Sequence, residues 1–317
     1  KFLINVPFGI ISIVLLMNNF DEELIKKKSI IDYQGIVILT LAIVSLLFGT
    51  MQIENGVTKM IPYILVTMVL LFTFYLFEKK STEPLIPFNI FNRTTIIINI
   101  IGFVASVVIV IIDSYMPIYI LNVLGYNATI SGLSLAPMSI SWLLSTFTLG
   151  KLLTKVGEKR ILQVCSVIML ISSSLLITLK SISSLPVVII IVIIMGYGAG
   201  ALFTIVTIVA QIGAEESMRG VATSTNSLIR TLGQTIGVSI FGSILNNGIE
   251  IYFKEQYIEG INSNNIFTAI DNNIIKAVDG SNAMFNGMHF IFIAMTFVAA
   301  INLITTFLLP KKSIIKD

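Results

Sequence analysis

A row of polar and small residues lies along one predicted helix within an otherwise apolar stretch. The row consists of Asn226, Arg230, Gly233 and Gly237. Spacings of four, three and four residues place all of them on one face of an α-helix. A charged side chain at bilayer depth costs about 3 kcal/mol or more, so Arg230 is expected to face a bundle interior or a watery cavity. This face, with the neighbouring Gln234, is the leading candidate for a substrate or proton pathway.

Two charged residues inside apolar runs each have two interpretations. Arg230 either takes part directly in substrate or proton coupling or holds a structural or gating position, because a long basic side chain can reach back to water or helix carbonyls. Asp113 lies well inside an apolar run, in VVIVIIDSYMP. At 1.5 Å per residue it is about 28 Å along its helix from Thr94, near the outer surface. If buried it would bind a cation or carry a proton, and at the membrane edge it would simply be hydrated.

Aromatic residues in the apolar stretches are candidates for stacking on an aromatic cation. They are Tyr115, Trp142, Tyr197 and Phe203. For Tyr115, a place in the aromatic belt at the membrane interface is the alternative.

The composition is that of an integral membrane protein. Hydrophobic residues make up 55% of the 317 residues, charged residues make up 12%, and the mean hydropathy is +0.94. Nine apolar stretches are expected to be membrane helices, because unpaired backbone is not tolerated in lipid and no alternating barrel pattern occurs. The stretches are residues 4–17, 33–51, 61–77, 95–120, 130–153, 161–179, 185–212, 221–245 and 287–309.

The basic residues indicate how these spans are oriented. Most of the 20 lysine and arginine residues fall in loops on one side, which the positive-inside rule makes cytoplasmic. The C-terminus is therefore predicted to be cytoplasmic. On the other side, residues 246–286 predict a long polar loop, either flexible or holding a short surface helix. Because the basic residues lie beside spans, the net charge of +3 points to a lipid bilayer rather than a nucleic acid as partner.

Enzyme chemistry finds no support in the residue pattern. The sequence contains no cluster of metal-ligating residues, no paired nucleophile and base, and no phosphate-binding loop after a strand. We therefore expect no enzyme, no cofactor and no metal site.

Two inner connections contain candidate gating residues. They are Gly150, Gly157 and Arg160 in GKLLTKVGEKR, and Glu215, Glu216, Arg219 and Gly220 before the span at 221–245. The alternatives are a basic loop held on the anionic inner leaflet and a solvated acidic loop at a helix N-terminus.

Small residues form two candidate packing seams. One contains Gly196, Gly198 and Gly200 in GYGAG, and the other contains Gly233 and Gly237 in TLGQTIG. Such spacing is typical of closely packed membrane helices, and a hinge is the alternative.

Several stretches, in this order along the chain, resemble one transporter family. They are FLINVPFGI, DYQGIVILTLAIVSLLFG, YMPIYILNVLGYNATISGLSLAPMSI, GKLLTKVGEKR and MRGVATSTNSLIRTLGQTIGVSIFG. They are similar to segments of the major facilitator superfamily, in particular its fourteen-span drug:proton antiporter branch, the multidrug efflux proteins of the EmrB/QacA type. In the inner-loop signature, Thr154 stands where the family usually has aspartate, and Lys155 stands where arginine is common.

The resemblance implies a fold, a function and a division of the chain. Residues 1–93 would be the end of an N-terminal lobe and two extra central spans, and residues 94–317 a six-helix C-terminal lobe. The chain begins with Lys1 rather than methionine and would lack the first five spans, hence the N-terminal lobe. The implied activity is proton-coupled efflux of lipophilic or cationic drugs across a bacterial plasma membrane by alternating access. The alternatives are export of a different metabolite and a membrane-embedded module that transports nothing.

Overall fold

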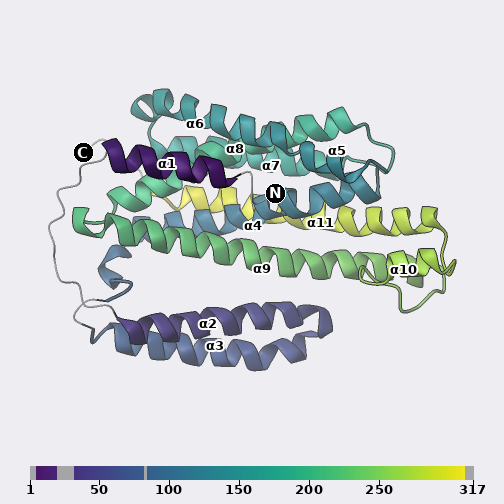
Figure 1. Ribbon diagram of the computed structural model, residues 1–317, viewed down its shortest axis with the longest axis horizontal. Helices are drawn as coiled ribbons and strands as arrows, with labels where there is room; N and C mark the ends of the chain where they lie inside the picture. The colour runs from purple at the N-terminus through teal and green to yellow at the C-terminus, as the bar shows by residue number, and fades with distance from the viewer. Residues whose placement is uncertain (1–4, 20–31, 82–83, 311–317) are drawn as a thin grey trace.

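The chain folds into a bundle of long helices. The computed structural model describes residues 5–19, 32–81 and 84–310, and no strand occurs among them. The long helices are α1 (Asn5–Asn19), α2 (Tyr33–Met51), α3 (Val57–Glu78), α4 (Arg93–Asn122), α6 (Ala136–Val156), α7 (Glu158–Ile177), α8 (Leu185–Ile212), α9 (Arg219–Lys254) and α11 (Ala277–Phe307). Shorter elements are η2 (Gln52–Asn55), η3 (Phe88–Ile90), α5 (Ala128–Leu133), η4 (Glu216–Met218) and α10 (Ile266–Asp271). Figure 1 shows the long helices lying side by side.

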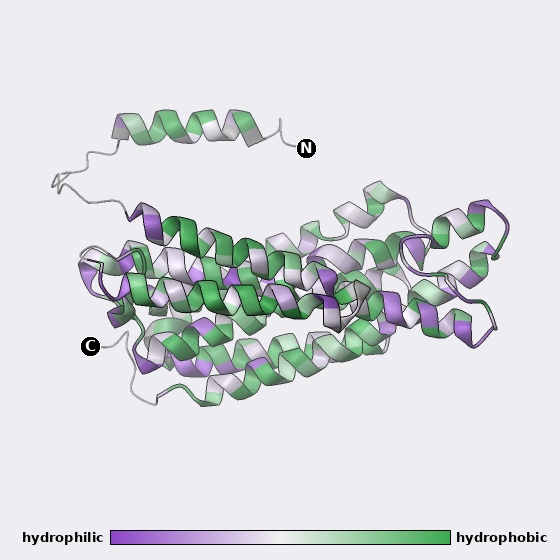
Figure 2. Cartoon of the chain, turned by 90° about the horizontal axis from the view of Figure 1, so that it is seen from below, coloured by the Kyte–Doolittle hydropathy of each residue, from purple (hydrophilic) through white to green (hydrophobic). Residues whose placement is uncertain are grey.

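The described helices have the length and polarity of membrane spans. Eight of them are long and apolar enough to cross a bilayer, with mean window hydropathies from 1.3 to 2.9. Figure 2 shows hydrophobic residues along their middles and hydrophilic residues toward both ends. The remaining long helix, α1, has only 15 residues, or about 22 Å at 1.5 Å per residue. The prediction of an all-helical membrane bundle is confirmed.

Six helices form the core of the bundle. Helix α4 packs against α8, α9 and α11, while α8 also packs against α6 and α7, and α11 packs against α7 and α9. Helices α2 and α3 form an antiparallel hairpin that reaches this bundle through contacts of α2 with α9. Helix α1 stands apart from the bundle in Figure 2, and its described side chains are exposed.

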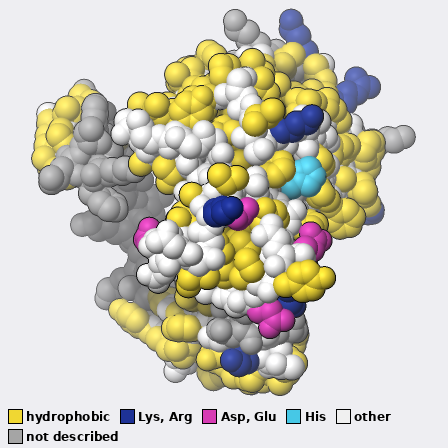
Figure 3. All heavy atoms as spheres, turned by 90° about the vertical axis from the view of Figure 1, so that its right-hand side faces the viewer, with side chains coloured by type: hydrophobic (Ala, Val, Ile, Leu, Met, Phe, Trp, Pro, Cys, Tyr) yellow, Lys and Arg dark blue, Asp and Glu magenta, His cyan; other side chains and the backbone are white. Residues whose placement is uncertain are grey.

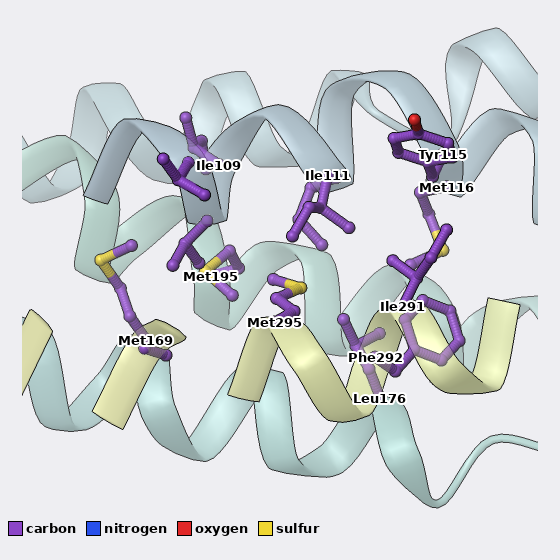
Figure 4. Packing of buried hydrophobic residues seen from close by; sticks show 14 of the residues in the cluster. Ile109, Ile111, Tyr115, Met116, Met169, Leu176, Met195, Ile291, Phe292 and Met295 are labelled. Carbon is purple, nitrogen blue, oxygen red and sulfur yellow. The ribbon is translucent and has the colours of Figure 1, made fainter. Parts of the chain in front are cut away.

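Methionine and isoleucine side chains fill the centre between α4, α7, α8 and α11. Met116, Met195 and Met295 are fully buried, and Met169 is almost so. Figure 4 shows these flexible side chains beside Phe292 and the isoleucines of α4. Methionine side chains are unbranched and flexible, so they fill the irregular gaps between these helices.

Glycines of α8 allow two neighbouring helices to approach closely. A Cβ atom at Gly196 would lie 2.6 Å from the Met138 carbonyl oxygen of α6, and one at Gly200 would lie 2.6 Å from the Trp142 carbonyl oxygen. Gly198 faces the other way, where a Cβ atom would lie 3.0 Å from the Cys165 carbonyl oxygen of α7. Helix α8 is therefore held at backbone contact on both sides.

Asn302 of α11 joins three helices through buried hydrogen bonds. Its Nδ2 donates to the Ile101 carbonyl of α4 at 2.9 Å, and its Oδ1 accepts from the Ser166 hydroxyl of α7 at 2.8 Å. Asn302 is 1% exposed, so both polar ends are satisfied away from solvent.

Two predicted helix boundaries are wrong. Helix α9 continues to Lys254 rather than ending at residue 245, and α11 begins at Ala277 rather than at residue 287. Hydropathy detects the lipid-embedded part of a helix, whereas the 36 residues of α9 extend about 54 Å, well beyond the roughly 30 Å hydrocarbon layer. The predicted loop at 246–286 therefore shortens to residues 255–276, which contain α10.

The predicted span at 130–153 is divided into two helices. Helix α5 ends at Leu133, and α6 begins at Ala136 with Pro137 in its first turn. Proline has no N–H to continue the preceding helix but fits the first turn of a new one, which places the break.

The contact between α6 and α8 predicts the effect of a single methyl group. Gly200→Ala would place that group against the Ser145 hydroxyl and the Trp142 backbone of α6. We expect a loss of about 1–3 kcal/mol, the usual cost of overpacking, and a lower melting temperature in detergent. The control is Gly132→Ala in α5, where no atom lies within 4 Å. Equal melting temperatures for the two variants would show that α6 and α8 are not in backbone contact.

The Asn302 contacts predict a second loss of stability. Asn302→Leu keeps the side-chain volume but removes both hydrogen bonds, and we expect about 1–3 kcal/mol of destabilisation. Asn247→Leu, at an exposed position of α9, is the matched control and should change the melting temperature little. In a double-mutant cycle, Ser166→Ala should cost less in the Asn302→Leu background. Strict additivity would contradict the hydrogen bond between the two side chains.

Candidate functional site

One face of α9 combines small residues with polar ones. A Cβ atom at Gly233 would lie 2.6 Å from the Phe103 carbonyl oxygen of α4, and one at Gly237 would lie 3.0 Å from Val110 Cγ1. Both glycines therefore bring α9 against α4. The same face carries Asn226 and Arg230 one to two turns earlier, so the close approach positions these side chains between helices.

Asn226 joins α9 to α4 inside the bundle. It is 1% exposed, and its Nδ2 donates to Asn99 Oδ1 at 2.8 Å. Its own Oδ1 is buried and has no hydrogen-bond partner among the described residues. Asn226 thus fixes the position of α9 rather than presenting an open polar surface.

Arg230 lies on an aromatic platform built by two other helices. Its guanidinium carbon is 4.1 Å from the centroid of the Phe203 ring of α8. Phe203 in turn stacks on Trp142 of α6, with centroids 5.3 Å apart and planes 10° from parallel. We call these three residues the arginine–aromatic stack. Its geometry is that of a cation–π interaction, which attracts a positive charge to a ring face.

The side chains of the stack differ in exposure. Phe203 is 3% exposed, whereas Arg230 and Trp142 are half-buried. Gly102 of α4 lies opposite the arginine stem, and a Cβ atom there would lie at ordinary contact distance, 3.5 Å, from Arg230 Cγ. Phe203 is therefore enclosed, while the other two residues keep accessible surface.

No acid lies beside Arg230 in the described part of the chain. The one ion pair found there joins Arg219 to Glu216 at 3.5 Å, and both side chains are largely exposed. Asp113 follows Gly102 by eleven residues on α4, which separates it from Arg230 by about 16 Å along the helix. The exposed Asp113 and the half-buried Arg230 therefore lie at different depths of the bundle.

Further polar side chains lie on the helices that carry the stack. The hydroxyls of Thr146 and Thr204 lie 3.4 Å apart, one turn and one residue away from Trp142 and Phe203 respectively. Gln211 of α8 donates to the Thr223 hydroxyl of α9 at 3.0 Å. Gln234 is half-buried, one turn beyond Arg230. The site thus combines aromatic surface, hydroxyls, amides and one positive charge.

Tyr115 joins α4 to α9 and is not part of the arginine–aromatic stack. It is 5% exposed, and its hydroxyl donates to the Val238 carbonyl at 2.8 Å. Figure 4 shows its hydroxyl oxygen pointing away from the labelled methionines. Tyr197 is half-buried on α8.

The candidate gating residues lie toward the ends of helices. Gly157, between α6 and α7, has a φ of 84°, a conformation that favours glycine. Next to it, Lys159 Nζ donates to the carbonyls of Phe307, at 3.0 Å, and Leu309 at the end of α11. Arg160 is exposed. Gly150 lies in α6, and its surroundings are outside the described part of the structure.

The connection between α8 and α9 is open to solvent. Glu215, Glu216, Arg219 and Gly220 are all exposed, and no atom lies within 4 Å of a Cβ placed on Gly220. A weak surface ion pair of this kind contributes little to stability.

An apolar groove lies beside α4 and α9. It has a volume of about 320 Å³ and is lined by Phe91, Ile96, Asn99, Ile100, Phe103 and Ile229. The groove contains no charged side chain in its lining, so it offers shape and apolar surface only. At the end of the molecule that carries α10, Figure 3 shows a few acidic and basic side chains among hydrophobic and polar ones.

Sequence reasoning missed three contributors to this architecture. Asn99 and Asn302 each stand alone among apolar residues, a pattern that could have marked them as helix-joining polar groups. The contact of Lys159 with the end of α11 joins residues almost 150 positions apart, and no local pattern indicates it.

The comparisons with known proteins agree on a transporter family. The family model for the Major Facilitator Superfamily matches residues 2–238. "Multidrug resistance protein 3" of Bacillus subtilis is 30% identical over 251 residues, which cover 78% of this chain and 49% of that protein. "Multidrug efflux pump SdrM" of Staphylococcus aureus is 27% identical over 272 residues, covering 85% and 58%. The chain thus spans about half the length of the curated relatives it matches.

A solved structure supports the same fold. It is a bacterial homologue of the human lysosomal transporter Spinster in an inward-facing and occupied conformation. The TM-score is 0.57 at 16% identity, with 87% of this chain and 68% of that chain covered. Because the family model matches most of the described helices, and this bundle has the same fold, the chain belongs to the Major Facilitator Superfamily.

Proposed function

We propose that this chain is the C-terminal lobe, with linking spans, of a proton-coupled exporter of lipophilic drugs. The names of the relatives support export of drugs, and the family supports transport by alternating access between two lobes. The proposed protein lies in a bacterial plasma membrane with its C-terminus in the cytoplasm. It acts on small molecules and protons and requires an N-terminal lobe.

The arginine–aromatic stack is the observation that carries this proposal. A positive charge on aromatic rings, held between three membrane helices, can bind large planar compounds without a catalytic group. Intramembrane charges in transporters mark substrate or ion pathways. We assign Arg230 and Gln234 to the wall that meets the compound, and Asn226 to holding that wall in place.

The separation of α1 from the bundle supports the proposed division of the chain. The described side chains of α1 are exposed although most are apolar, whereas the helices after residue 93 enclose a core of their own. We therefore propose residues 1–93 as the end of an N-terminal lobe and two linking spans, and residues 94–317 as a C-terminal lobe. Rocking of this lobe against the other would expose the stack to either side of the membrane in turn.

Loss of the Arg230 charge should abolish export. The test uses this chain joined to an N-terminal lobe, such as that of the Bacillus subtilis relative, in cells loaded with a lipophilic dye. We expect the fusion to export the dye, an uncoupler to stop it, and Arg230→Ala to reduce the rate at least about tenfold. Lys254→Gln, which removes an exposed basic residue at the end of the same helix, should leave the rate near wild type. Export that an uncoupler does not stop would contradict proton coupling. Full activity of Arg230→Ala would show that Arg230 is not part of the substrate or proton pathway.

Asp113 is proposed to handle the proton near the outer mouth. Asp113→Asn keeps the shape but cannot ionise, so dye should still exchange down its gradient while uphill export is lost. Asp271→Asn, at an exposed position of α10, is the control. Uphill export by Asp113→Asn at the wild-type rate would show that the proton uses another group.

A further inference from the structure

We infer that the arginine–aromatic stack binds the anionic group of planar aromatic compounds and disfavours aromatic cations. This inference rests on the proposed function, since it names the class of compound that the same site would take. It reverses the sequence-based expectation that the aromatic residues stack on a cation. It rests on the contact and free donors of the guanidinium, on the charges of the neighbouring helices and on the exposure of Trp142.

The guanidinium of Arg230 keeps its hydrogen-bond donors in addition to its contact with Phe203. Its central carbon is 4.1 Å from the centroid of that ring, and the N–H groups of a guanidinium lie in its own plane. No described residue accepts a hydrogen bond from Arg230. Since arginine offers five donors in a fixed fork that matches a carboxylate, the edge is preorganised for an anionic acceptor.

The charges on the surrounding helices leave this arginine without a counter-ion. Helix α8 contains no aspartate, glutamate, lysine or arginine, and the charged residues of α6 are Lys151 and Lys155 near its end. On α4 the acid is Asp113, about 16 Å along the helix from the level of Arg230. On α9 itself the acid is Glu250, twenty residues later. An anion that binds at the stack therefore supplies the counter-ion that Arg230 lacks.

The aromatic part of the site favours the same choice. The ring of Phe203, which could attract a cation, already carries Arg230 and also stacks on Trp142. An aromatic cation would have to displace the guanidinium or approach its positive charge. The half-buried ring of Trp142 remains available to the body of a planar anion, whereas the hydroxyls of Thr146 and Thr204 already donate to carbonyls of their own helices.

The experiment uses Trp142 as its own reporter, because it is the single tryptophan of the chain. The full 317-residue chain is purified into nanodiscs, and quenching of Trp142 fluorescence is titrated at pH 7. The probes share one nitrobenzyl body and differ in charge: 4-nitrobenzoate, 4-nitrobenzyl alcohol and 4-nitrobenzylammonium. Quenching of free N-acetyltryptophanamide corrects for collisions.

The expected result is at least about tenfold tighter binding of 4-nitrobenzoate than of 4-nitrobenzylammonium, about 1.4 kcal/mol. Arg230→Gln should abolish this preference, Arg230→Lys should retain part of it, and Lys254→Gln, at an exposed position of the same helix, should leave it unchanged. Circular dichroism and gel filtration show which variants are folded, and the wild-type ratio alone already tests the inference.

Three results would overturn the inference. Tighter binding of the cation would do so, as would equal affinities for all three probes, or quenching of no probe beyond the free-tryptophan control. Equal affinities would still leave drug export intact, because the neutral probe would bind. Failure of export in the dye assay, with the anion preference present, would instead leave the inference standing and remove the proposed function.

Discussion

A guanidinium inside a membrane bundle needs a partner for its charge, and here an aromatic ring supplies that partner. Arg230 rests on Phe203, which rests on Trp142, so three helices contribute one residue each. A half-buried charge without a carboxylate is costly in lipid, and the ring face lowers that cost without neutralising the charge. The positive charge is therefore retained for a ligand.

The packing of the lobe follows from the need to bring these helices together. Gly200 allows the backbone of α8 to meet Trp142, which places that ring beside Phe203. Gly102 of α4 lies opposite the stem of Arg230, and Gly233 brings α9 against the same helix. Glycines that pack membrane helices at backbone contact thus also determine where the rings and the guanidinium meet. Fold and candidate site depend on the same small residues.

The sequence indicated the helices and the special face of α9 but not the partners of that face. Helical spacing placed Asn226 and Arg230 together because both lie on one element, and hydropathy located the spans because lipid requires it. The contact of Arg230 with Phe203 and Trp142 joins three spans, and spacing within one helix carries no information about it. The ends of α9 and α11 were misplaced because they project beyond the apolar layer, where hydropathy no longer distinguishes helix from loop.

The most direct test of this account is to locate a bound aromatic anion in the protein. A cryo-electron microscopy map of the chain with 4-iodobenzoate, whose iodine is easily identified, would show where the compound lies. The account predicts the carboxylate at the edge of the Arg230 guanidinium and the iodinated ring beside Trp142. Iodine density in the apolar groove lined by Ile96, Phe103 and Ile229, with none beside Trp142, would contradict it.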